Sequence, residues 1–194
     1  QNAQLAQGLL RGHRTVETYN PTLIGKCISW FGEHLVYRYG ENEVIKFSQL
    51  ARFPGIRGEK AEERDIEVGK KFFREFMLDT RIAHSPDRYR KALLQPFVSG
   101  RILRKSDLAD PAVMEQFDEL VRRHTELIDA GHPPVDLMSG LGFLLSEARN
   151  IFLLDTKEVR VIDVTLGDML SLPLRKLAVH RQEAILLKYK QNTA

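Results

Sequence analysis

RNIFLLDTKEVRVID, residues 149–163, holds two short apolar runs on either side of a polar turn. Asn150 precedes the first run and Asp163 follows the second. If the turn occupies residues 155–158, the runs pair antiparallel and Asn150 faces Asp163, with the two Cβ atoms roughly 5 Å apart. One amide oxygen and one carboxylate at that separation could share a hard cation such as Mg²⁺. Asn and Asp also end strands because they suit turns, so the pair alone leaves an ordinary surface hairpin open.

Three runs rich in β-branched or aromatic residues precede this hairpin, at 22–31, 34–39 and 43–48. Short glycine-containing turns join them, which predicts a three-stranded antiparallel meander. Apolar residues at helical spacing predict one amphipathic helix over about 59–78. A further strand that runs into a glycine turn is expected at 91–100.

The second half of the chain is richer in helix signals. Asp110 and Pro111 form an N-cap followed by proline at the first helical position, and Gly131 ends the apolar stripe that follows. A final helix is expected near 171–190, and a short one at 3–11. A sheet-rich first half and a helix-rich second half indicate an α+β fold rather than alternating βαβ units.

Composition limits the class of protein. The chain has 194 residues, of which 43% are hydrophobic, so it can bury a core as one domain or two small lobes. The formal charge of +3, without a long Lys/Arg run, gives no specific signal for nucleic acid. The apolar runs are too short for a membrane span. Cys27 is the single cysteine, so no intrachain disulfide can form, and a cytoplasmic location is expected.

The hairpin contains Asn-Ile-x-Leu, and an Ile-Asp pair ends thirteen residues after Asn150. This pattern resembles the metal-binding hairpin of the protein-kinase-like superfamily, which includes the aminoglycoside phosphotransferases. The resemblance implies a two-lobed fold, with a sheet-rich lobe at 1–99 and a small helical lobe at 100–194 that holds the hairpin. It implies ATP as a ligand, and Mg²⁺ held by Asn150 and Asp163. The matching residues are spaced singly over about 22–165, and of the family's Asp-Phe-Gly-type triplet only Asp163 is present.

The upstream strands carry a second resemblance. Residues 24–47, which include Val-Ile-Lys, look like the nucleotide-covering strand–turn–strand of the same family and the lysine strand after it. This implies that Gly25 and Gly32 cover the nucleotide and that Lys46 pairs with its phosphates. Residues 26–29 replace most of the family's glycines, so backbone N–H groups there are less free to wrap phosphates. A lysine between Ile and Phe is also a common strand residue that lays its stem along apolar surface.

The resemblance places an acidic partner of Lys46 in the helix at 59–78. Asp65 has the expected apolar or small residues three, four and seven positions later, and Glu62 fits less well. The acids of this helix would equally form a solvated face.

The run LLQPFVSG resembles the hinge between kinase lobes. Backbone groups from Gln95 to Val98 would then meet an adenine. Any apolar strand that ends at a glycine would look similar, so this match adds little by itself.

The catalytic base of the family is absent from its usual position. Leu145 stands five residues before Asn150, where the family has an Asp, and leucine cannot accept a proton. Either Glu147 or Asp136 replaces the base, or the chain is a pseudokinase that acts through contacts with other proteins. Both acids also fit ordinary surface or capping positions. The sequence therefore predicts a kinase-like, ATP- and Mg²⁺-binding protein of doubtful phosphotransferase activity, with a regulatory scaffold as the alternative and a plain structural domain as the third reading.

Overall fold

The computed structural model of this chain describes residues 17–29, 34–48, 61–87, 90–135, 137 and 148–164. The helices predicted at 3–11 and 171–190 lie outside these residues. No helix in the described part is long and apolar enough to cross a membrane.

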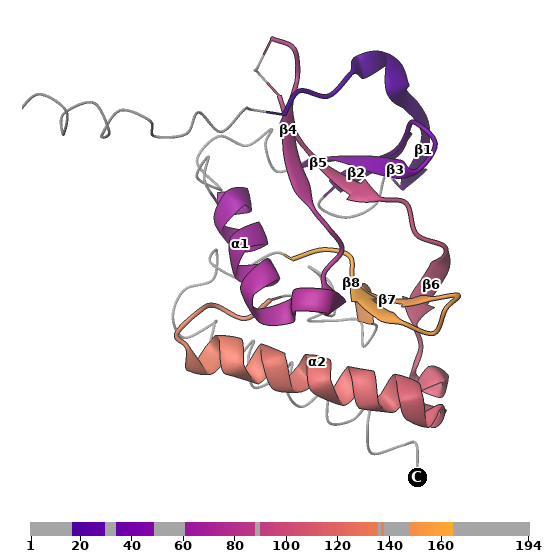
Figure 1. Ribbon diagram of the computed structural model, residues 1–194, viewed down its shortest axis with the longest axis vertical. Coiled ribbons are helices and arrows are strands. Elements are labelled where there is room, and N and C mark those ends of the chain that lie inside the picture. The colour runs from indigo at the N-terminus through magenta and orange to yellow at the C-terminus, as the bar shows by residue number, and fades with distance from the viewer. Residues whose placement is uncertain are drawn as a thin grey trace, which may run out of the picture.

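A five-stranded antiparallel sheet forms the upper part of the molecule in Figure 1, in the order β1-β2-β3-β5-β4. Its strands are β1 (Ile24–Ser29), β2 (His34–Tyr39), β3 (Glu43–Ser48), β4 (Arg81–His84) and β5 (Lys91–Pro96). The predicted meander is confirmed, and β2 and β3 have the predicted bounds. β1 and β5 are shorter than expected, and the four-residue strand β4 at the sheet edge was not predicted.

A second, three-stranded sheet has the order β6-β7-β8 and lies near the helices. Its strands are β6 (Gly100–Leu103), β7 (Ala148–Leu154) and β8 (Val159–Val161). β7 and β8 are the predicted hairpin, and β6 is a third strand that the sequence did not reveal. The chain therefore passes from the first sheet into the second within the few residues that follow β5.

In the described part of the chain, two long helices and three short 3-10 helices accompany the sheets. They are α1 (Ala61–Phe73), α2 (Pro111–Asp129), η1 (Pro21–Leu23), η3 (Arg74–Phe76) and η4 (Lys105–Ala109). The predicted helix at 59–78 exists, but its α-helical part ends at Phe73 because Arg74 takes a left-handed conformation, with φ of 47°. The predicted N-cap of α2 is confirmed, because Asp110 accepts a hydrogen bond from the Ala112 N–H at 3.0 Å.

Among the described residues, the buried apolar side chains form two clusters. One lies on a single face of the five-stranded sheet and is made by Tyr19, Tyr39, Ile45, Ala83, Ala92 and Leu94. The other joins α1 and η3 to α2 and to the small sheet, and its fully buried members include Phe73, Phe117, Leu120, Ile151 and Val161. α1 thus packs into the second cluster, while Lys46 and Gln95 on the opposite face of the five-stranded sheet contact Ile162, which follows β8.

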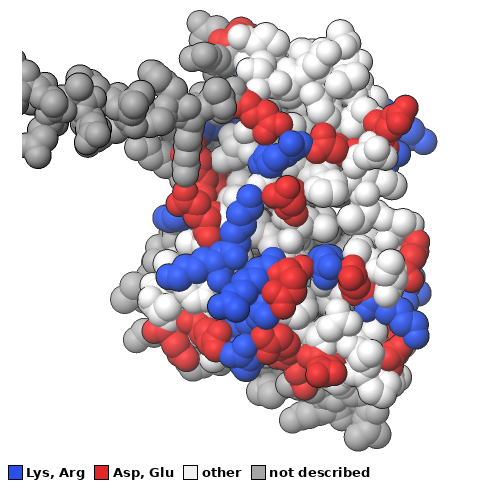
Figure 2. Space-filling model, viewed as in Figure 1, with Lys and Arg blue, Asp and Glu red and all other residues white. Residues whose placement is uncertain are grey.

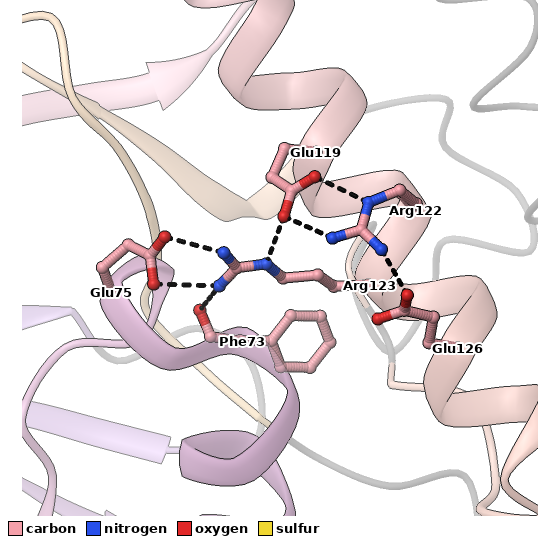
Figure 3. A network of polar contacts seen from close by, with 6 residues as sticks. All are labelled: Phe73, Glu75, Glu119, Arg122, Arg123 and Glu126. Carbon is pink, nitrogen blue, oxygen red and sulfur yellow. Dashed lines mark hydrogen bonds and ion pairs between the residues drawn. The ribbon is translucent and has the colours of Figure 1, made fainter.

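Arg123 ties α2 to η3 (Figure 3). Its guanidinium donates to both carboxylate oxygens of Glu75, at 2.9 and 2.7 Å, and to the Phe73 carbonyl at 3.1 Å. Its Nε–H donates to Glu119 at 2.7 Å. The neighbouring Arg122 bonds Glu119 and Glu126 on the same helix. These contacts fix how α2 lies against the end of α1.

Candidate functional site

The β7–β8 hairpin turns one residue earlier than predicted. The Leu154 N–H donates to Glu158 O and the Lys157 N–H donates to Leu154 O, both at 2.9 Å. Lys157 takes a left-handed conformation, with φ of 65°, which closes a three-residue turn instead of the predicted turn at 155–158. Ile151 therefore pairs with Val161.

This register places Asn150 opposite Ile162, whose N–H donates to Asn150 O at 3.0 Å. The prediction that Asn150 directly faces Asp163 is wrong by one residue. β8 ends at Val161, so the pleat of the strand does not set the direction of the Asp163 side chain. Asn150 and Asp163 still stand at the same open end of the hairpin.

Lys46 reaches this end of the hairpin from the large sheet. Its side chain is 7% exposed, and its Nζ donates to the Ile162 carbonyl at 2.6 Å. Burial lowers the pKa of Lys46 from its ordinary value, and the neighbouring Asp163 carboxylate acts in the opposite direction. A contact across 116 positions of sequence thus brings the predicted phosphate lysine beside the predicted metal ligand.

Gln95 enters the same site through its side chain. It faces Val44 across β3 and β5, which puts it on the same face of the sheet as Lys46. Its Nε2 donates to Thr80 Oγ1 at 2.8 Å and to the Ile162 carbonyl at 3.2 Å. The sequence predicted a role for backbone groups at this position, so the part played by the Gln95 amide was missed.

The hinge prediction covers the residues just after β5. The Phe97 N–H donates to the Asn42 carbonyl at 2.7 Å, and the Arg38 guanidinium lies 3.6 Å from the centre of the Phe97 ring. Val98 is half-buried and lies two residues beyond Pro96, the last residue of the β3–β5 ladder. The chain here links the two sheets.

His34 is a member of the site that sequence reasoning missed. It begins β2, is 6% exposed, and places Nδ1 3.1 Å from Asp163 Oδ2. Strand alternation from Val36, which faces Lys46, could have put His34 on the same face as the lysine. Its contact with Asp163 depends on the fold.

Asp65 lies in α1 and is 1% exposed, whereas Glu63 and Glu67 on the same helix are exposed. Its Oδ1 lies 3.1 Å from Arg64 Nη2. The expected ion pair with Lys46 is not formed here, since Lys46 donates to the Ile162 carbonyl instead. Asp65 is thus the buried acid of its helix, but another group contacts the lysine.

α1 packs directly against the residue that follows Asp163. A Cβ atom added to Gly69 would lie 3.1 Å from Val164 Cγ1 and 2.7 Å from Met77 Sδ. The absence of a side chain at Gly69 therefore allows the helix to approach this segment closely.

Of the remaining predicted residues, only Gly25 is described. It lies in β1, and a Cβ added there would meet Arg38 Cβ at an ordinary 3.5 Å, so the backbone does not require glycine. Gly32 and the two candidate bases, Glu147 and Asp136, lie outside the described residues, as does Leu145.

Charged groups elsewhere on the described surface are largely paired. On the face seen in Figure 2, Lys and Arg side chains lie beside Asp and Glu side chains. Arg101, for example, bonds Asp107 through two nitrogens at 2.5 Å, and Lys157 bonds Asp110 at 2.9 Å. Within the described ranges, no three His, Cys, Asp or Glu side chains group in a way that could hold a metal ion. A metal at the hairpin would therefore need the Asn150 amide, water or ligand oxygens in addition to Asp163.

The fold is similar to those of known kinases. The structure of Legionella pneumophila Lpg2603 kinase bound to IP6 matches with a TM-score of 0.53 and 16% identity over 87% of this chain. Rad53 1–466 in complex with AMP-PNP matches with a TM-score of 0.51 and 16% identity over 86% of this chain. The chain spans 58% of the first structure and 44% of the second.

Sequence comparison adds no family. No protein-family model matches the chain, and no curated protein is significantly similar to it. At 16% identity the structural matches show the fold alone, so the chain has a kinase-like α+β fold.

Proposed function

We propose that this chain is a kinase-like protein that binds ATP and Mg²⁺ between two lobes that meet near residues 99 and 100. The observation that carries the proposal is the approach of Lys46 to the Ile162–Asp163 segment, because a buried lysine beside a carboxylate suits a ligand that brings phosphates and a metal ion. A similar structure, that of Rad53, is a complex with AMP-PNP.

The residues fit such a ligand by their chemistry. Lys46 would hold the phosphates, and Asp163 with the Asn150 amide would hold the metal. Asp65, buried on α1, would orient Lys46 once the lysine leaves the Ile162 carbonyl. Carboxylate and amide oxygens are the ligands that Mg²⁺ takes, and the ion would neutralise phosphate charge.

The adenine side of the proposed site would be formed by the end of β5 and the residues that follow it. Backbone groups between Gln95 and Val98 would meet the base. Gly25, on β1, and Gly32, which lies outside the described residues, would cover the nucleotide. The amide of Gln95 would border the site from the sheet.

The primary test is a thermal-shift titration with ATP and Mg²⁺. Binding to the folded state stabilises it by mass action, by about 2.7 kcal/mol at a ligand concentration of 100 times Kd. The native chain should show a shift that needs both components, and Asp163→Ala should abolish it. Glu158→Ala is the matched control, because it removes a half-exposed acid from the same hairpin. Absence of a shift at millimolar ATP and Mg²⁺ would refute the proposal.

The chain is either a phosphotransferase with an unusual base or a pseudokinase that acts through protein contacts. Leu145 at the expected base position favours the pseudokinase. Phosphoryl transfer would be measured by the loss of ATP in the native chain and in Glu147→Ala and Asp136→Ala. Turnover lost in one of these variants, with binding kept, would identify the base. Binding without turnover in the native chain would support the pseudokinase.

A further inference from the structure

His34 joins the large sheet to the proposed metal ligand. Its Nδ1 lies 3.1 Å from Asp163 Oδ2, and the two residues are 129 positions apart in the sequence. Because an ionised carboxylate only accepts hydrogen bonds, Nδ1 carries the hydrogen and donates it.

His34 and Lys46 approach the hairpin from the same face of the sheet. Val36 directly faces Lys46, and His34 stands two residues from Val36 on β2. Opposed residues share a face, and so do alternate residues of one strand. One side chain bonds the Ile162 carbonyl and the other bonds Asp163.

These two contacts compete with the proposed ligand. The His34 N–H occupies part of the electron-pair capacity of the Asp163 carboxylate, which a metal ion would use. Lys46, 7% exposed, donates to a backbone carbonyl where a phosphate oxygen would otherwise accept. Protein groups would therefore have to leave Asp163 and Lys46 before these residues could hold a metal ion and phosphates.

The second ring nitrogen of His34 adds an energetic cost to the conformation in which His34 contacts Asp163. Nε2 is buried and has no hydrogen-bond partner among the residues described. A buried polar atom without a partner raises the free energy of the conformation that holds it. Movement of the ring toward water would satisfy Nε2, so the His34–Asp163 contact is one that a ligand can displace.

We propose that His34 is an autoinhibitory residue, which closes the nucleotide site by binding Asp163 and must withdraw before ATP and Mg²⁺ bind. The inference rests on the proposed function, since it concerns the same site. His34 would weaken the binding of ATP and Mg²⁺, whereas a residue that contacts the ligand would strengthen it. A closed conformation lowers apparent affinity in proportion to the fraction of molecules that are open.

The test is isothermal titration of the whole chain with ATP in excess Mg²⁺. His34→Ala should bind on the order of tenfold more tightly than the native chain, because the competing hydrogen bond to a charged group is gone. His84→Ala is the matched control, since His84 lies on edge strand β4 of the same sheet and also has a buried ring nitrogen without a partner among the described residues. Its affinity should equal that of the native chain.

A second variant guards against a folding defect at the first. His34→Leu replaces the imidazole with an apolar side chain, removes the donor, and should also tighten binding. Equal affinity in the native chain and both His34 variants would overturn the autoinhibitory role and leave the proposed function standing. Weaker binding in both variants would overturn it as well and make His34 a ligand contact. Absence of binding to every protein would refute the proposed function and this role together.

Discussion

Lys46 and Arg123 are both buried cations, but the protein provides them with very different partners. Arg123 is 8% exposed and bonds two carboxylates and a carbonyl, and the hydrogen bonds that it donates to Glu75 raise its pKa. Lys46 is 7% exposed, donates to a neutral carbonyl, and has its pKa lowered by burial.

The difference separates a structural cation from one that suits a ligand. A guanidinium whose donors are matched by fixed acceptors holds two elements together. An ammonium group with a single neutral acceptor, beside a carboxylate, gains more from an incoming phosphate. Equal burial is therefore compatible with a structural role for Arg123 and with ligand binding by Lys46.

The largest expected effect is a loss of stability when Arg123, the cation that links two elements, is replaced. Arg123→Met should lower the free energy of unfolding by about 2–4 kcal/mol, because it leaves the Phe73 carbonyl without its donor and removes the link from α2 to Glu75. Urea denaturation would measure the loss. Arg122→Met is the control, since the adjacent arginine is 56% exposed and its bonds stay within α2. Equal losses in the two variants would contradict the assignment.

The next largest effect concerns Lys46, the cation that is proposed to bind the nucleotide phosphates. Lys46→Met should weaken binding of ATP with Mg²⁺ at least about tenfold, or about 1.4 kcal/mol, without lowering the free energy of unfolding. The physical reason is that methionine keeps the apolar stem and removes a charge that burial disfavours. Calorimetry and urea denaturation would measure the two quantities.

Lys91→Met is the control for this variant, because Lys91 lies on β5 of the same sheet and pairs with Glu63 at 3.4 Å. Its affinity for the nucleotide should not change. A loss of stability in Lys46→Met as large as that in Arg123→Met would remove the distinction between the two cations.

A smaller effect concerns acid. Hydrogen bonds from Arg123 are the main cause that lowers the pKa of Glu75 from 4.5 to about 2. A carboxyl group with a lowered folded-state pKa stabilises the protein fully above its unfolded value, and this contribution is lost as the pH falls from about 4.5 through about 2. The stability difference between the native chain and Arg123→Met should shrink over that interval, as urea titrations at several pH values would show. A constant difference would place the contribution of Arg123 elsewhere.

The smallest expected effect is a change in stability at alkaline pH, and its cause is the pKa of Lys46, which burial lowers. Because the folded-state pKa of Lys46 lies below the ordinary value of 10.5, the unfolded chain binds more protons between the two values. The contribution of Lys46 therefore becomes less unfavourable as the pH rises through that window, and the advantage of Lys46→Met should decline. The Asp163 carboxylate acts against this lowering of the Lys46 pKa. An advantage that grows with pH would show that the lysine pKa is raised.

Local patterns were sufficient for the elements that carry strong periodicity or end signals. β2, β3 and α2 could be predicted almost to the residue because alternation, short turns and the Asp110–Pro111 cap act within a few positions. β4 and β6 were missed because four residues give too little pattern, and both strands lie at the edges of their sheets. The predicted hairpin register was wrong by one residue, because nothing in the sequence around Lys157 indicates that this residue takes a left-handed conformation.

Local chemistry and motif spacing were enough to predict the main strands of both sheets, the long helices, and Lys46 and Asp163 as candidate site residues. What those residues contact depends instead on how distant segments pack in the fold. This packing brought Lys46 and Gln95 to one carbonyl, placed His34 on Asp163, and gave Arg123 its acceptors. The physical reason is that burial and partners, which set the energy of a charge, come from segments more than one hundred positions apart at the candidate site.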